Sequence, residues 1–539
     1  MPRHSQLRQR LTIGAAASAL LIGAVAAAGV QPALAQATRV SSPTAQAACT
    51  ALAQVGWPGV KVTGATVVAA GGFVQPAEGG PGANRPPPAV YKTMPAFCRV
   101  SVTLTPSSDS DIKSEVWLPL SGWNGKFQVP GNGGWAGSLS YANMGEALAA
   151  GYATASTDTG HPNDGSPSAS FAYKHPEKML DFGYRALHET TATGKTLIHT
   201  FYGVAPQSSI YNGCSTGGRM GLNAIERYPM DFDGAIVGAP VNPMTRLHAG
   251  SLYNSIYAAK DPANRIPPDK YAMIHKAMLA ECDQLDGVKD GVVENPMACH
   301  WKPETIQCKG ADGPTCLTKA QVGMMNTIYG GAKNPRTGEQ VYPGWERGAE
   351  MGISVTAGPQ PEGPAVGTWR YVVMQNPDWD WKTLDFDKDI ELSDRMGAAQ
   401  IDATSNDLTP FIAHGGKLLM FHGWADPNVA PRNTVNTYGK LVAGSGGEAK
   451  VSNSIRLFMV PGMGHCGGGD GPNTFDRVAV IDQWMTTGNA PASMLASHAT
   501  NGKIDRTRPL CAFPMVAKYK GSGSTDDAAN FSCAAPSKR

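Results

Sequence analysis

Four short apolar runs, each followed by a turn rich in glycine or proline, mark the hydrophobic pattern of the chain. The runs are SIYNG, GAIVGAP, GGKLLMF and SIRLFMV, and each is typical of a buried strand. After the first run, the segment RMGLNAIERYP repeats apolar residues at a spacing that one face of a helix can bury. The pattern therefore predicts an α/β protein in which strands alternate with helices.

The turn between the first strand and its helix carries a nucleophile motif. Gly213, Cys214, Ser215, Thr216 and Gly217 fit the pattern G-x-S-x-G, the sharp turn that exposes a serine hydroxyl in α/β-hydrolases. Glycines belong there because a side chain would collide with the neighbouring strand or helix. The pattern is common, so Ser215 is a candidate nucleophile whose interpretation depends on its partners.

Two later strands supply partners for a serine nucleophile. The loop after GGKLLMF carries Asp426 and the loop after SIRLFMV carries His465, so the chain order is serine, aspartate, histidine. This order is typical of the α/β-hydrolase fold, where histidine is the base and aspartate orients it. The alternative interpretations are a turn-forming aspartate before Pro427 and a loop histidine without a chemical role.

Residues 1–35 have the pattern of a signal peptide. The cationic segment MPRHSQLRQR precedes the apolar run LTIGAAASALLIGAVAAAGV, and Ala33-Leu34-Ala35 fits a small-x-small cleavage site. The alternative is an N-terminal membrane anchor, since the run is nearly long enough to span a bilayer. Cleavage would leave a mature chain that begins near Gln36 and works away from the membrane, as a secreted or periplasmic protein.

The charge balance excludes several classes of partner. The 539 residues include 45 Lys and Arg against 43 Asp and Glu, and 42% are hydrophobic. The chain can bury a large core, but it has no excess of cations with which to neutralise phosphates or an anionic membrane surface. We therefore expect a globular protein whose partner is a small molecule rather than a nucleic acid or a membrane.

All ten cysteines follow the predicted cleavage site, so an oxidising compartment would allow five disulfides. Zinc binding is the competing use of cysteine, but the chain lacks the paired C-x-x-C spacing of many zinc sites. Proximity along the chain suggests three pairs, although sequence alone does not determine connectivity. These pairs are Cys282–Cys299, Cys308–Cys316 and Cys511–Cys533.

Two of the remaining cysteines adjoin the candidate catalytic residues. Cys214 precedes the serine and Cys466 follows the histidine, so a bond between them would tie the two loops across the site. Closing so long a loop stabilises a fold by at most about 5 kcal/mol, and fixing the distance from serine to histidine matters more for catalysis. Alternatively, Cys214 is a buried residue with another partner. The first pairing leaves Cys49 and Cys98 for each other.

Segments along most of the mature chain resemble the tannase and feruloyl esterase family. The resemblance rests on GCSTGG at residues 213–218, on HC at residues 465–466, and on HGWADP, WNGKFQVPGNGGWAG, DTGH, ECDQLDGVKDGVVENP and NPDWDW. It implies an α/β-hydrolase core and a disulfide between the neighbours of the serine and the histidine. It also implies hydrolysis of esters of aromatic acids, such as gallates, hydroxycinnamates and, in one branch, mono(2-hydroxyethyl) terephthalate.

The resemblance further implies an oxyanion hole. One donor would be the backbone N–H of Thr216. The other would come from the turn PGNGGWAG, where Gly133 is the first candidate and Gly134 the next. The alternative is that this turn only connects a strand ending near Val129 to a helix around Gly145.

The interval from Ser215 to Asp426 is longer than one or two strand–helix units require, and it predicts an inserted lid. We place the lid at residues 241–408, between α/β-hydrolase core segments at residues 36–240 and 409–539. Aromatic side chains of the lid would either stack on an aromatic acyl group or form the core of the lid itself. They include Trp345, Trp369, Trp379 and Trp381.

The lid segment CDQLDGVKDGVV has the composition of a calcium loop. It sets Asp283, Asp286 and Asp290 close together, and such carboxylates repel one another unless a cation neutralises them. Backbone carbonyls of Val288 and Val292 would complete an oxygen-only ligand set, and the resemblance implies structural calcium on these residues. The spacing departs from that of an EF-hand, and the alternative is a solvated acidic turn.

The expected function is that of a secreted serine carboxylesterase acting through an acyl-serine intermediate. Its substrate would be a small aromatic ester, free or attached to a plant polysaccharide or tannin, and no organic cofactor is implied. An alternative substrate is a terephthalate monoester, whose free carboxylate needs a lid cation such as Arg347, Arg370 or Arg395. The alternative of another class is a non-catalytic module that grips a polyol through calcium.

Overall fold

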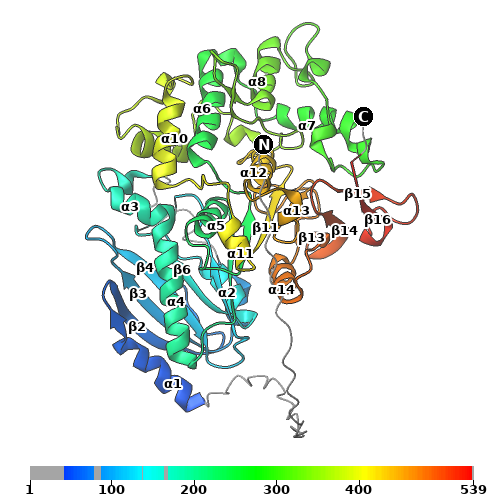
Figure 1. Cartoon of the computed structure of the whole chain (residues 1–539). Coiled ribbons are helices and arrows are strands. Elements are labelled where there is room, and N and C mark those ends of the chain that lie inside the picture. Colours follow the sequence, from blue (N-terminus) through cyan, green and yellow to red (C-terminus); the bar gives the residue numbers. More distant parts are fainter. Residues whose placement is uncertain (1–41, 78–85, 136, 163–167, 537–539) are drawn as a thin grey trace, which may run out of the picture. The chain divides into compact units, whose positions relative to one another are not determined.

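The computed structural model describes residues 42–77, 86–135, 137–162 and 168–536 (Figure 1). The signal peptide predicted at residues 1–35 lies outside these residues. None of the helices that they form has both the length and the apolar character needed to cross a bilayer.

Ten of the described strands form one sheet, in the order β1-β2-β3-β4-β6-β5-β7-β8-β11-β12 (Figure 1). Neighbours from β1 to β6 pair antiparallel, whereas the strands from β6 to β12 run parallel. Their bounds are β1 Gly56–Trp57, β2 Val60–Val68, β3 Phe97–Leu104, β4 Ile112–Pro119, β5 Lys126–Pro130, β6 Ala153–Thr157, β7 Ser208–Cys214, β8 Gly234–Gly238, β11 Lys417–Gly423 and β12 Ile455–Val460.

The four apolar runs in the sequence form the neighbouring parallel strands β7, β8, β11 and β12, as predicted. Their side chains alternate between two hydrophobic clusters, so that Tyr211 faces one cluster and Ile210 the other. A strand that is buried on both faces needs apolar residues at nearly every position, which explains the unbroken runs.

Helices cover both faces of the sheet. The cluster that contains Tyr211 also contains side chains of α4 (Ala186–Tyr202), α5 (Thr216–Arg227), α11 (Thr409–Ala413) and α12 (Pro431–Gly444). The cluster that contains Ile210 includes side chains of α2 (Tyr141–Ala149) and α14 (Arg477–Thr487). The carboxyl ends of the parallel strands therefore emerge between two helical layers, where loops meet at one edge of the sheet.

A long insertion separates β8 from β11, which are neighbours in the sheet. Its helices include α6 (Met244–Lys260), α7 (Lys270–Cys282), α8 (Lys319–Gly330), α9 (Gly363–Gly367) and α10 (Asp389–Gln400), with a hairpin of β9 (Ala332–Lys333) and β10 (Gln340–Tyr342). Of the four tryptophans considered in the sequence, Trp345, Trp369 and Trp381 are buried in a cluster formed mostly by the insertion, and Trp379 packs against it. The interpretation as lid core is therefore correct for these three, whereas the lid boundaries 241–408 stay a prediction.

All five predicted disulfides are present. Cys49–Cys98 fastens α1 (Ser42–Ala51) to β3. The C-terminal hairpins β13 (Ser493–Thr500) with β14 (Lys503–Cys511), and β15 (Val516–Tyr519) with β16 (Phe531–Ala534), are joined by Cys511–Cys533. Cys282–Cys299 and Cys308–Cys316 lie within the insertion.

Candidate active site

Ser215 occupies the turn between β7 and α5 in a strained backbone conformation. Its φ is 65° and its ψ is −128°, a region that costs a residue other than glycine about 1 to 3 kcal/mol. The surroundings hold it there, because its N–H donates to the carbonyl of Gly238 at 3.0 Å and its carbonyl accepts from Val241 at 3.2 Å. The tight turn also explains Gly217, where a Cβ would lie 2.7 Å from the Asn132 carbonyl oxygen.

The sheet brings the three predicted catalytic residues together. Gly423 at the end of β11 pairs with Val460 at the end of β12, so both loops leave the sheet at the edge where β7 ends. Nε2 of His465 lies 2.9 Å from Oγ of Ser215, and Nδ1 lies 2.7 Å from Oδ2 of Asp426. An ionised carboxylate only accepts, so Nδ1 carries the proton and Nε2 is free to accept one from the serine.

Electrostatics favour an ionised Asp426 and a basic His465. Burial opposes ionisation of Asp426, but His465 and the hydrogen bonds from His422 and His465 outweigh it and hold the pKa of Asp426 well below its usual range. Burial likewise opposes protonation of His465, yet Asp426 and the more distant Glu362 raise the pKa of His465. The arrangement can therefore take a proton from a hydroxyl and stabilise the resulting imidazolium.

His422 is a contact of the candidate site that sequence reasoning missed. Its Nε2 lies 2.9 Å from Oδ2 of Asp426, and its Nδ1 lies 2.7 Å from Oγ1 of Thr434. The motif HGWAD contained a signal, since the histidine stands four residues before the aspartate. That spacing has no fixed meaning in a strand that runs into a loop, so the contact was visible only in the structure.

The disulfide Cys214–Cys466 joins the immediate neighbours of Ser215 and His465. Its two Cα atoms are 6.1 Å apart, although 252 positions separate the residues in the chain. The bond thus ties the end of β7 to the loop after β12. That it preserves the reactive geometry stays a prediction.

A cavity of about 470 Å³ opens beside Ser215 and His465. Gly133 and Gly134 line it, and a Cβ at either glycine would meet no other atom within 4 Å, so the backbone there is open to a ligand. Thr216 is the first residue of α5, and its N–H has no acceptor within the helix. These positions suit an oxyanion hole, and their role in catalysis stays a prediction.

The three lid arginines considered for carboxylate binding are engaged elsewhere. Nε of Arg347 donates to the Trp301 carbonyl at 2.7 Å, and Nε of Arg370 to the Trp379 carbonyl at 3.0 Å. Arg395 forms an exposed ion pair with its helix neighbour Glu391. None of the three is among the described residues that line the cavity beside Ser215.

A core arginine takes their place in the wall of the cavity. Arg477, at the start of α14, lines it together with Asn143 and Asn212. Its Nε donates to Oδ1 of Asn212 at 3.2 Å. Burial lowers the pKa of Arg477, and the nearby Glu146 and Asp476 act in the opposite direction. The cavity wall therefore offers several hydrogen-bond donors, and acidic groups stand close to Arg477, the one arginine among its described residues.

The predicted calcium loop lies against the C-terminal hairpins. The carboxylate of Asp283 accepts backbone N–H groups of Asp290 and Gly291, both at 3.1 Å. Nη2 of Arg508 in β14 donates to Oδ2 of Asp290 at 2.6 Å. The pKa of Asp286 is raised to about 6, first by burial and then by Asp290 and Asp283.

The donor chemistry of this loop fits calcium, because its carboxylates supply hard oxygen ligands, and burial, Asp290 and Asp283 raise the pKa of Asp286 although Arg508 acts in the opposite direction. Calcium binding by Asp283, Asp286, Val288, Asp290 and Val292 stays a prediction. Among the described residues, the side-chain cluster whose ligand atoms lie close enough together for one metal ion is Cys308, Asp312 and Cys316, and the aspartates of the predicted calcium loop do not form such a cluster. Its two cysteines form a disulfide, so they offer no thiolate.

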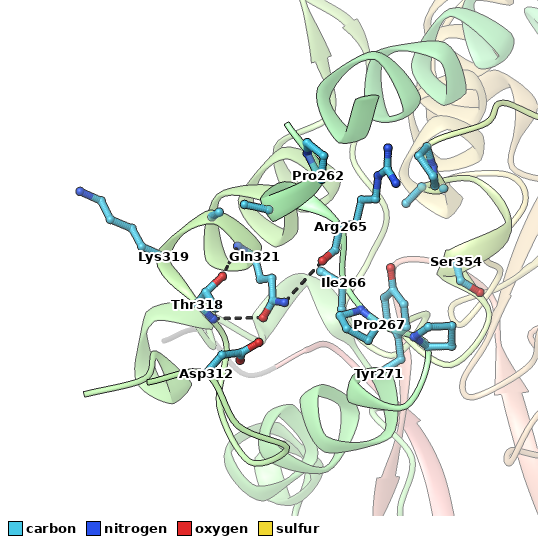
Figure 2. Close-up of a pocket in the computed structure, with 16 residues that line it drawn as sticks. Pro262, Arg265, Ile266, Pro267, Tyr271, Asp312, Thr318, Lys319, Gln321 and Ser354 are labelled. Atoms are coloured by element: carbon cyan, nitrogen blue, oxygen red, sulfur yellow. Dashed lines mark hydrogen bonds between the residues drawn. The ribbon is translucent and has the colours of Figure 1, made fainter. Parts of the chain in front are cut away.

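A larger cavity, about 810 Å³, lies in the insertion and is shown in Figure 2. Prolines such as Pro262 and Pro267 line it beside Ile266 and Tyr271. No histidine is among the described residues of its wall, so this wall holds no pairing of serine and histidine like that of Ser215 and His465. The candidate catalytic residues Ser215 and His465 therefore lie at the smaller cavity.

Comparisons with known proteins agree with this geometry. The profile described as "Tannase and feruloyl esterase" matches residues 98–534. A protein of Xanthomonas campestris pv. campestris named as an uncharacterized esterase is 36% identical over 542 residues, which cover 92% of each chain. A probable feruloyl esterase B-2 of Aspergillus terreus is 32% identical over 464 residues, covering 81% of this chain and 86% of its own.

Solved structures show the same fold. The crystal structure of feruloyl esterase B from Aspergillus oryzae superimposes with a TM-score of 0.84 at 30% identity, covering 91% of this chain and 100% of that one. A tannin acyl hydrolase from Aspergillus niger superimposes with a TM-score of 0.74 at 22% identity, covering 92% and 95%. The second likeness concerns the fold alone. Together they confirm the predicted α/β-hydrolase fold class.

Proposed function

The chain belongs to the tannase and feruloyl esterase family and is a carboxylic ester hydrolase, and from this premise we propose that it is a secreted serine esterase of aromatic acids. The observation that carries the proposal is the hydrogen-bonded series from Ser215 Oγ through His465 to Asp426. Five disulfides support an oxidising compartment outside the cytoplasm. Family membership gives no support to the non-catalytic binding module.

In the proposed mechanism, Nε2 of His465 takes the proton of Ser215 while Oγ bonds to the ester carbonyl carbon. The oxyanion forms at the N–H of Thr216 and the backbone around Gly133. When the tetrahedral species collapses, the carbon–alkoxy bond breaks and His465 gives its proton to the departing oxygen, which leaves as the alcohol. Water then attacks the acyl-serine by the same route, and Asp426 stabilises each imidazolium.

The decisive experiment replaces the nucleophile. Ser215→Ala should reduce kcat on methyl ferulate by at least about 10⁴-fold, because the acyl acceptor is lost while binding groups remain. Exposed Ser108→Ala is the matched control and should retain full activity. An incubated and quenched wild-type enzyme should carry the acyl group on Ser215 by mass spectrometry. Wild-type rates in the folded Ser215→Ala protein would overturn the proposal.

The polar cavity beside Ser215 supports a hydroxylated alcohol portion, as in an ester attached to a plant polysaccharide or tannin. Asn143, Asn212 and Arg477 present donors suited to several hydroxyl groups. The terephthalate monoester is a weaker proposal, because Glu146 and Asp476 stand near Arg477, which would receive its carboxylate. Comparing kcat/KM for a feruloylated sugar, methyl gallate and that monoester tests whether the monoester is the poorest substrate of the three. Asn143→Ala should lower kcat/KM for the sugar ester more than for methyl ferulate.

Calcium is proposed as a structural ion of the insertion, held by the loop from Asp283 to Val292. The loop's contacts with Arg508 and, through Glu294, with the backbone of Ala517 support a role in joining the insertion to the C-terminal hairpins. The ion would supply charge compensation there, and no step of ester hydrolysis passes through it.

A further inference from the structure

The carboxylate of Asp426 is held by four hydrogen bonds, two from backbone N–H groups to one oxygen and two from imidazoles to the other. Oδ1 accepts two backbone N–H groups, from Asn428 at 2.8 Å and Val429 at 3.0 Å. Oδ2 lies 2.7 Å from Nδ1 of His465 and 2.9 Å from Nε2 of His422. The base therefore shares its carboxylate oxygen with a second imidazole, and the side chains of Asp426 and His422 are both fully buried.

The contacts of His422 limit which of its two ring nitrogens carries a proton. The carboxylate only accepts, so Nε2 of His422 carries a proton. Nδ1 faces the buried hydroxyl of Thr434 at 2.7 Å, and a hydroxyl can donate to it. The hydroxyl could also accept from a protonated Nδ1, and electrostatics favour the neutral imidazole, which accepts from Thr434 and donates to Asp426. A second buried cation at this position would repel the imidazolium that forms on His465 during the reaction.

We propose that His422 is a positioning residue of the esterase, which holds Oδ2 of Asp426 toward His465 and shares the negative charge of the carboxylate without adding a charge of its own. The inference rests on the proposed function, since it concerns how the base is oriented. It assigns to α12 a part in the site, because Thr434 on that helix orients the imidazole. His422 touches neither the serine nor the cavity beside it.

The consequence for pH dependence follows from the charged and titratable groups around His465. These are Asp426 from the core and Glu362 from the insertion, while Tyr342 of β10 feels the charge of Asp426. Removing the donor on His422 leaves more of the carboxylate's charge facing His465, which then holds its proton to higher pH. If the substitution merely displaced the carboxylate, His465 would lose charge stabilisation and its pKa would fall instead.

The test compares His422→Leu with His422→Gln, whose amide can donate and accept at nearly the same positions as the ring. The leucine variant should lose about 10- to 100-fold in kcat, and the acid limb of kcat/KM should move up by about 0.5 pH unit. The glutamine variant should recover most of the rate and the wild-type limb. A limb in the leucine variant that is unchanged or moves down, or no recovery with glutamine, would overturn the inference.

A second measurement does not depend on His422→Leu and holds if that variant fails to fold. Nitrogen-15 NMR of the histidines, with His422→Gln used for assignment, should show Nε2 protonated and Nδ1 bare at neutral pH. A doubly protonated ring, or a proton on Nδ1 alone, contradicts the inference. If Ser215→Ala keeps its esterase activity, the proposed function is wrong as a whole. If Ser215→Ala is inactive but His422→Leu has the wild-type kcat and pH profile, only the inference about His422 is wrong.

Discussion

Two aspartates in this molecule, the fully buried Asp426 and the half-buried Asp286, have pKa values shifted in opposite directions. At the candidate active site, imidazoles and backbone N–H groups face Asp426, and its pKa lies well below the usual range despite complete burial. In the acidic loop of the insertion, burial and the neighbouring carboxylates raise the pKa of Asp286 to about 6. Burial opposes ionisation at both positions, so the neighbouring groups decide the result.

The two sites differ in whether the protein itself balances the carboxylate's charge. Around Asp426 the protein itself supplies the donors, so the charge is stable without any ligand. Around Asp286 the protein supplies further negative charge, so a bound cation or a proton is needed to neutralise the carboxylate. We therefore expect changes at the first region to act on catalysis, and changes at the second to act on stability.

The largest effect should come from removing the charge of Asp426. In Asp426→Asn the amide no longer stabilises the imidazolium and favours the wrong tautomer of His465, so kcat should fall by about 10³- to 10⁴-fold. Steady-state kinetics on methyl ferulate measure the loss, with exposed Asp378→Asn as the control. A fall below tenfold would mean that Asp426 is not the orienting acid.

A smaller loss is expected when the tether between the serine and histidine loops is removed. The folded Cys214→Ala, Cys466→Ala double variant should lose about 10- to 100-fold in kcat, because the separation of Ser215 and His465 is no longer restrained. Cys308→Ala with Cys316→Ala removes a disulfide of the insertion and should leave kcat unchanged. Equal rates in the two double variants would show that the active-site disulfide serves stability alone.

Chelation should change stability and spare the rate at moderate temperature. Excess EDTA should lower Tm by about 3 to 5 °C, because an ion that binds only the folded state stabilises it by mass action. Differential scanning calorimetry checks this, and readdition of calcium should restore Tm. Asp286→Asn should make Tm insensitive to EDTA. An unchanged Tm in the wild-type protein would contradict the calcium site.

The smallest expected effect is a pH dependence of the calcium-free protein. Asp286 titrates near pH 6 in the folded chain but at its ordinary, lower value when unfolded, so folding takes up a proton between those values. Its favourable contribution is therefore present at low pH and is lost as pH rises through about 6. Urea unfolding in EDTA should show this loss, and calcium or Asp286→Asn should remove it. A free energy of unfolding that rises with pH over this interval in the wild-type protein, but not in Asp286→Asn, would contradict the prediction.

Much of the fold and site was predictable because the signals are local. The buried runs that became β7, β8, β11 and β12 needed only their hydrophobic pattern, and the turn around Ser215 needed only its glycines. Asp426 and His465 follow from their places after strands, since parallel strands end at one edge of a sheet. Two disulfides beyond the near neighbours, Cys214–Cys466 and Cys49–Cys98, followed once that edge was assumed.

Contacts between distant segments decided the rest. His422 contacts both Thr434 and Asp426 because β11 packs on α12. Arg508 reaches Asp290 because the C-terminal hairpin lies on the acidic loop. Arg477 rather than a lid arginine lines the cavity for the same reason. Sequence alone predicted the candidate catalytic residues and the strands before them, because each is recognised by a short motif of residues close together in the chain. Tertiary structure decided which charges those groups meet, because electrostatic partners depend on separation in space.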